Sequence, residues 1–170
     1  MKRINKQVII VVIILLIVAF SWLGIRKTFF PELEAERLIN KYYQAIIDED
    51  YEKAYQYLYI YDQEKIDSEG SRSAGTSLTE TEAKQFYHSK ISFLKEQNYR
   101  VKDYKIVEVE YEDGHSFWHH LVLEVEIDGE IYHKKELAFL QNERLMIGEQ
   151  DDLFAPYRDG RMNISIAEAE

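Results

Sequence analysis

Three side chains near the centre of the sequence, His119, His133 and Lys135, are of types that perform acid–base chemistry or hold a ligand. An imidazole titrates near neutral pH and can act as a general base. Small-molecule sites are commonly apolar cavities that contain a few such polar groups. We therefore take the three residues as a candidate ligand-binding set. The alternative is that they are solvated at the open end of a sheet, since the sequence shows no partner that would position a catalytic base.

The grouping of these residues depends on the register of one predicted hairpin, "FWHHLVLEVEIDGEIYHKKELAF", residues 117 to 139. A two-residue turn at Asp128-Gly129 would pair Leu123 with Lys134. A three-residue turn with a left-handed Gly129 pairs Leu123 with His133 instead. This second register keeps the apolar side chains together, so we expect it. It places His119, His133 and Lys135 on the inner face.

The outer face of the same hairpin is a candidate partner surface made of Trp118, His120 and Val122. Successive strand residues point to opposite faces, so these three alternate with the inner ones. An exposed aromatic residue there would mark a binding surface, and coverage by the tail or by another chain is the alternative. The same alternation separates His119 from His120, and no known ligand spacing occurs. We expect no metal.

Composition and missing motifs narrow the possible chemistry. The chain has no cysteine, which excludes disulfides, thiolate metal sites and a cysteine nucleophile. It has no Gly-rich phosphate loop, Gly-x-Ser-x-Gly elbow or His-Glu-x-x-His helix. Residues 1–27 hold five of the 21 basic side chains and none of the 31 acidic ones, so the remainder carries a balance of -15. That charge repels nucleic acid. We lean toward a non-enzymatic protein without a cofactor.

The N-terminal stretch "VIIVVIILLIVAFSWLGI", residues 8–25, contains no charge. Its length nearly spans a bilayer core of about 30 Å, and Trp22 occupies the position of an interfacial anchor. We predict a transmembrane signal-anchor helix, and a cleaved signal peptide is the alternative. The basic residues of segment 1–7 keep it in the cytoplasm. The protein is then a single-pass cell-membrane protein whose C-terminal domain is extracytoplasmic.

Residues 31–150 are predicted to form one α+β domain. Pro31 suits a first helical position, and apolar residues recur at helical spacing from Glu32 to about Asp48. Asp50 is a good N-cap for a second short helix. In "YYQAIIDEDYEKAYQYL", residues 42–58, we interpret the tyrosines as the packed contact between these two helices, and we call this contact the tyrosine seam. Tyr43 is expected at the edge of the seam. The alternative is that the tyrosines surround a ligand. A capping box at Thr79 begins a third helix that reaches about residue 97.

After residue 98 the apolar period changes from 3.6 to 2, which indicates about four antiparallel strands. The first contains "KIVEVEYEDG", the hairpin supplies two more, and the last covers about residues 144–148. From residue 151 to residue 170 we expect an irregular tail.

The order of three helices and an antiparallel meander resembles the nuclear transport factor 2-like superfamily, also called cystatin-like. The motifs that carry the resemblance are "YYQAIIDEDYEKAYQYL" and "TETEAKQFYHSKISFL". The resemblance covers residues 32–150 and implies a curved sheet that wraps the helices around a cone-shaped cavity. The enzymes of this superfamily use an acid or a histidine inside the cone, but no motif transfers such a residue to this chain.

We therefore expect a membrane-anchored extracytoplasmic binding or scaffold protein of the bacterial cell envelope. Its partner would be an envelope protein or a second copy of the chain. Two alternatives remain. One is a small-molecule pocket or weak enzyme centred on His119, His133 and Lys135. The other is an assembly factor of a conjugation or secretion machine, as some anchored members of the superfamily are.

Overall fold

Helical apolar periodicity in the first half of the domain and strand periodicity in the second produce an α+β fold. The computed structural model describes residues 31–63, 75–111 and 117–166. The chain divides into two units, Met1–Glu34 and Ala35–Glu170, and the second contains nearly all described residues. Within the described ranges no helix is both long and apolar enough to cross a membrane. The predicted tail 1–7 and anchor 8–25 lie outside these ranges.

The three predicted helices are present, and the second and third begin at their predicted caps. The Asp50 side chain accepts a hydrogen bond from the Lys53 amide at the start of the second helix. Thr79 and Glu82 form a complete capping box at the start of the third, which satisfies two backbone donors. Local sequence therefore determines where these helices begin. Their bounds are α2 Pro31–Ile47, α3 Tyr51–Tyr55 and α5 Glu80–Glu96.

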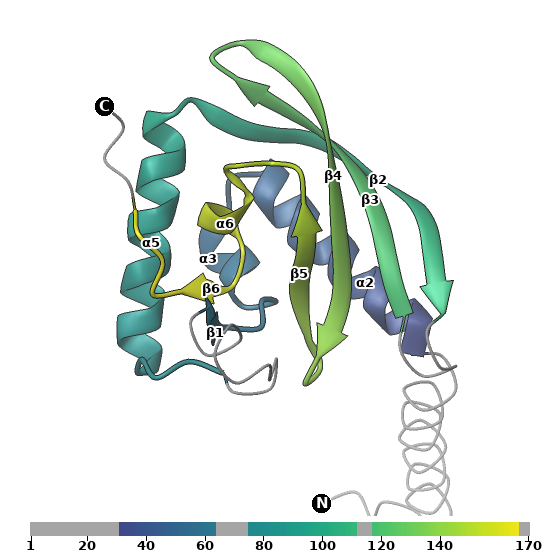
Figure 1. Cartoon of the computed structure of the whole chain (residues 1–170), viewed down its shortest axis with the longest axis horizontal. Helices are drawn as coiled ribbons and strands as arrows, with labels where there is room; N and C mark the ends of the chain where they lie inside the picture. Colours follow the sequence, from purple (N-terminus) through teal and green to yellow (C-terminus); the bar gives the residue numbers. More distant parts are fainter. Residues whose placement is uncertain (1–30, 64–74, 112–116, 167–170) are drawn as a thin grey trace, which may run out of the picture. The chain divides into compact units, whose positions relative to one another are not determined.

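Four strands form one antiparallel sheet in the order β2-β3-β4-β5, which confirms the predicted meander. Figure 1 shows α2 crossing behind these strands. Two bulges, at Val101/Asp103 and Ile106/Glu108, interrupt the long first strand. Bulges bend a strand and increase its twist, so they help the sheet to curve. The strands are β2 Tyr99–Tyr111, β3 Phe117–Ile127, β4 Glu130–Gln141 and β5 Arg144–Gln150.

The predicted register of the β3–β4 hairpin is wrong. Ile127 pairs with Glu130, so the turn has two residues, and both are left-handed: φ is 51° at Asp128 and 83° at Gly129. Such a turn matches the twist of the two strands. Leu121 consequently pairs with Glu136. We had rejected this register because the alternative keeps the apolar side chains together, but a buried arginine compensates the charge of Glu136, as described below.

The tyrosine seam is confirmed as part of the hydrophobic core. Tyr42 and Tyr43 are fully buried and meet edge to face, with ring centroids 4.9 Å apart. Tyr43 does not lie at the edge of the seam as predicted, because its ring stacks on Tyr104 of β2 at 4.7 Å. Tyr55 of α3 packs against Tyr87 of α5 at 5.2 Å. The seam thus joins three helices to the sheet, which explains the pattern without a ligand.

We had expected an irregular C-terminal segment, but part of it has regular structure. It forms a one-turn helix, α6 Ala155–Arg158, and a two-residue strand, β6 Arg161–Met162, which pairs in parallel with β1 Tyr61–Asp62. These elements are too short to show a period in the sequence. Gly160 permits their close approach, since a Cβ atom there would lie 1.9 Å from the Tyr59 carbonyl oxygen.

Candidate functional site

Within the described part of the domain, we consider two groups of side chains that could carry function: a buried ionic network in the interior and a groove on the outer face of the sheet. The network centres on the guanidinium group of Arg158 in α6. Its Nη1 and Nη2 donate to the two carboxylate oxygens of Glu136 in β4, at 3.0 and 2.5 Å. This bidentate arrangement matches the planar fork of arginine to a carboxylate.

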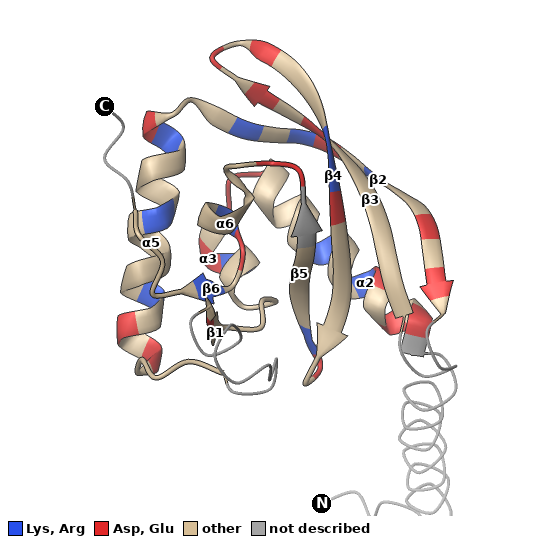
Figure 2. Cartoon of the chain, viewed as in Figure 1, with Lys and Arg blue, Asp and Glu red and all other residues tan. Residues whose placement is uncertain are grey.

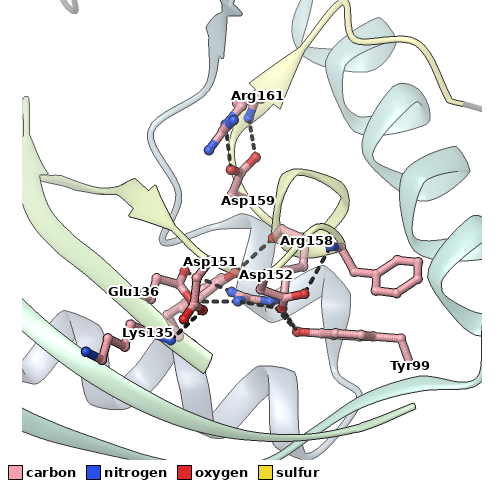
Figure 3. Close-up of polar contacts among 10 residues, drawn as sticks. Tyr99, Lys135, Glu136, Asp151, Asp152, Arg158, Asp159 and Arg161 are labelled. Carbon is pink, nitrogen blue, oxygen red and sulfur yellow. Dashed lines mark hydrogen bonds and ion pairs between the residues drawn. The ribbon is translucent and has the colours of Figure 1, made fainter. Parts of the chain in front are cut away.

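Two more residues complete the shell around the Arg158 guanidinium, as Figure 3 shows. Arg158 Nε donates to the hydroxyl oxygen of Tyr99 at 3.0 Å, and that hydroxyl donates to Asp152 at 2.6 Å. The same Asp152 oxygen lies 3.6 Å from Nη2. All three guanidinium nitrogens therefore have partners, and those partners come from β2, β4 and the segment after β5.

The backbone around Arg158 is also bound by side chains. Its carbonyl oxygen accepts hydrogen bonds from the hydroxyls of Tyr42 at 2.8 Å and Tyr87 at 3.4 Å. Lys90 of α5 is fully buried, and its Nζ donates to the carbonyl oxygens of Asp159 at 2.8 Å and Arg161 at 2.6 Å. The seam tyrosines thus border a polar interior, and this interior is occupied by the chain itself.

Burial is the largest single influence on the pKa values of Glu136, Arg158 and Lys90 in this network. It raises the pKa of Glu136, and the Arg158 guanidinium opposes that rise. Burial also disfavours the charged form of Arg158, but the Glu136 carboxylate together with Tyr99 and Tyr42 outweighs it and holds the pKa of Arg158 well above its ordinary value. Burial lowers the pKa of Lys90 to about 8, opposed by the Asp159 carboxylate. Because these charges are bonded to one another, the network holds the segment in place.

The second group lines an open groove of about 450 Å³ on the outer face of the sheet. Val122 and Leu137 supply apolar side chains, and Lys135 and Glu108 supply charges of opposite sign. Asp151 closes the groove beside β4, where its carboxylate accepts a hydrogen bond from the Lys135 amide at 2.7 Å. The lining residues are Val107, Glu108, His120, Leu121, Val122, Lys135, Glu136, Leu137 and Asp151.

Charges of both signs surround the groove. His120 Nε2 lies 3.1 Å from a carboxylate oxygen of Glu110. Figure 2 shows basic residues near the start of β2 and acidic residues near its end. A surface with an apolar floor and charged edges is typical of protein–protein contact regions.

The structure separates the three residues of the predicted ligand-binding set. His119 pairs with Ala138 and is buried on the inner face. His133 pairs with Glu124 and Lys135 pairs with Val122, so both lie on the outer face. The hairpin register causes this separation, because a one-residue slip exchanges the two faces of a strand. The three residues therefore do not form one site.

The predicted partner surface has its residues on the predicted face. His120 and Val122 line the groove. Trp118 is partly buried and stacks on Phe139 with ring centroids 4.7 Å apart. It belongs to a small apolar cluster on the outer face, together with Tyr59, Tyr61, Phe139 and Met146.

Sequence reasoning missed the members of the interior network. Glu136 could have been found only with the correct hairpin register, since it then becomes a charged residue on a core-facing position. Arg158 gives no signal, because "YRDGR" resembles an exposed loop. Among the described residues, no group of three or more histidine or acidic side chains is arranged to hold a metal ion.

No protein family, curated protein or solved structure matches this chain. The interpretation of function therefore depends on the chemistry of the groove and of the interior network. Of these two, only the groove is open to solvent.

Proposed function

We propose that this protein is a non-enzymatic binding or scaffold protein of the bacterial cell envelope that binds its partner through the outer groove of the sheet. The observation that carries the proposal is the contrast between the two candidate sites. Arg158, Glu136 and their neighbours fill the interior, whereas the groove presents apolar and charged side chains to solvent.

The chemistry of the groove favours a protein partner over a small metabolite. A small-molecule site usually buries most of its ligand in a deep pocket. This groove is open and combines Val122 and Leu137 with Lys135 and Glu108. A protein segment with an apolar side chain between charged ones would satisfy both features.

We further infer that residues 8–25 anchor the protein in the cytoplasmic membrane and that the domain lies on the outer side. The support is the uncharged apolar stretch and the basic residues before it. The resemblance to nuclear transport factor 2-like domains belongs to the same proposal. It is supported by the order of α2, α3, α5 and the β2–β5 meander.

The experiment that tests this function compares groove variants in a pull-down from native membranes. Lys135→Glu reverses one charge in the groove, and Lys53→Glu reverses a charge on exposed α3 as a matched control. We expect Lys135→Glu to reduce recovery of the specific partner about tenfold, equivalent to the loss of one good charged contact. Equal recovery with both variants would contradict binding through the groove.

A further inference from the structure

The C-terminal segment is held in the interior in the way that a protein holds a peptide ligand. Its regular structure is limited to the single turn of α6 and the two-residue pairing of β6 with β1. Most of its attachment comes from side chains of the body of the domain. These bind both the Arg158 side chain and the main chain that follows it.

The walls around the Arg158 side chain are specific for a guanidinium group. Glu136 accepts two parallel hydrogen bonds, and the Tyr99 hydroxyl accepts the third, from Nε. Asp152 adds a second carboxylate at 3.6 Å. An ammonium group is a single point charge and cannot match both a bidentate carboxylate and a third acceptor as the planar fork of arginine does. The arrangement therefore selects arginine over lysine.

The site also binds peptide backbone next to the arginine. Tyr42 and Tyr87 donate to the carbonyl of Arg158, and Lys90 donates to the carbonyls of Asp159 and Arg161. These three donors lie on α2 and α5, and their side chains are fully buried. Donors on two helices thus bind the main chain from Arg158 to Arg161. Acceptors on two strands and on the segment after β5 bind the Arg158 side chain.

We propose that the interior of this domain is a guanidinium-binding site, and that the C-terminal segment occupies it as a tethered ligand through Arg158. The chemical class of the ligand is an arginine side chain at the C-terminal end of a single helical turn of a peptide. This inference does not depend on the proposed function of the outer groove. It assigns the interior a ligand that the chain itself supplies.

The test is chemical rescue in the full-length protein. Arg158→Ala removes the side chain beyond Cβ, and ethylguanidinium has the shape of the missing part. We expect millimolar ethylguanidinium to raise the melting temperature of this variant saturably, by about 5 °C at a concentration tenfold above its Kd. Propylammonium at the same ionic strength should have no such effect, and neither cation should stabilise the wild type in this way.

A second variant identifies the site of rescue. In Arg158→Ala combined with Glu136→Gln, the neutral amide cannot replace the bidentate carboxylate, so the ethylguanidinium effect should disappear. The proposal is overturned if ethylguanidinium fails to stabilise Arg158→Ala, if propylammonium works equally well, or if the double variant responds equally.

If Arg158→Ala does not fold alone, the same comparison is made on refolding yield. Selective recovery of folded protein in ethylguanidinium supports the proposal. Equal recovery in ethylguanidinium and propylammonium, or no recovery in either, overturns it.

Discussion

Glu136 and Arg158 illustrate how a buried ion pair depends on both of its members. Each charge loses its hydration on burial, and the bidentate contact and the neighbouring Tyr99 and Asp152 compensate this loss. Further opposite charges lie close by, since Lys90 Nζ is 3.6 Å and Arg161 Nε is 2.8 Å from carboxylate oxygens of Asp159. Removing one member therefore leaves an uncompensated charge.

Glu136→Gln should destabilise the protein by about 3–5 kcal/mol, because it leaves the Arg158 guanidinium buried without its bidentate carboxylate. Urea unfolding followed by circular dichroism measures this change. Glu96→Gln, on the exposed last turn of α5, is the control and should stay within about 0.5 kcal/mol of the wild type. A Glu136→Gln protein as stable as the control would show that the ion pair does not hold the segment.

Lys90 should make stability rise with pH above neutrality. Its pKa is lowered to about 8 in the folded protein, whereas an unfolded lysine has a pKa of about 10.4. Between these values the unfolded chain binds more protons, so stability increases with pH. Neutral Lys90 can still donate to the carbonyls of Asp159 and Arg161. The charged groups around it are Asp159 and Arg161.

Lys90→Met removes this titration. We expect the unfolding free energy of the wild type to rise between pH 7 and pH 9.5 by about 2 kcal/mol more than that of the variant. The buried tyrosines Tyr42, Tyr43, Tyr87 and Tyr99 have pKa values raised by burial, so their effect begins above this window and has the opposite sign. Identical pH dependence in both proteins would exclude a titrating Lys90.

At the scale of elements, the contact between β1 and β6 depends on Gly160. A methyl group there would lie 1.9 Å from the Tyr59 carbonyl oxygen, which is backbone and cannot rotate away. We expect Gly160→Ala to cost about 3 kcal/mol and to separate β6 from β1. Gly148→Ala is the control, since the nearest atoms are side-chain carbons of Phe139 and Leu137 at 3.3 and 3.4 Å, which can shift.

Hydrogen exchange of the Tyr61 amide reports the separation directly. This amide donates to the Gly160 carbonyl at 3.0 Å. It should lose protection in Gly160→Ala and keep it in Gly148→Ala. Retained protection in both would mean that the two strands tolerate the methyl group.

The elements differ in how well their sequence predicts them. The helices were predictable because local signals define them: long apolar periods in α2 and α5, and caps at Asp50 and Thr79 that begin α3 and α5. The hairpin register was not predictable from local sequence. It places Glu136 on the core-facing side of β4, and its partner Arg158 lies 22 residues away. The elements α6 and β6 are held by such distant contacts and carry no period of their own.

The same reasoning explains the outcome for the candidate sites. His120 and Val122 were expected on the outer face, and strand alternation alone places them there. Lys135 and His133 were expected on the inner face and lie on the outer one, because that expectation depended on the turn length. The interior network required knowledge of the packed fold, since its members come from elements that are distant in sequence.

At the scale of the whole molecule, we propose that the interior of the domain provides stability and that the outer face of the sheet provides binding. Arg158, Lys90 and the tyrosine seam fasten the C-terminal segment inside the domain, and the outer face of the sheet is left to contact other molecules. The acidic balance of residues 28–170 adds long-range repulsion from nucleic acid and anionic surfaces. A partner with complementary charge would be favoured.

The most direct test of binding through the groove is site-specific photo-crosslinking in native membranes. A photoreactive amino acid replaces Val122 in the groove, or Ser92 on exposed α5 as the control. We expect a discrete cross-linked protein from position 122, absent from position 92 and reduced about tenfold when Lys135→Glu is added. The same products from both positions, or an adduct from position 122 that persists unchanged with Lys135→Glu, would contradict the proposed function.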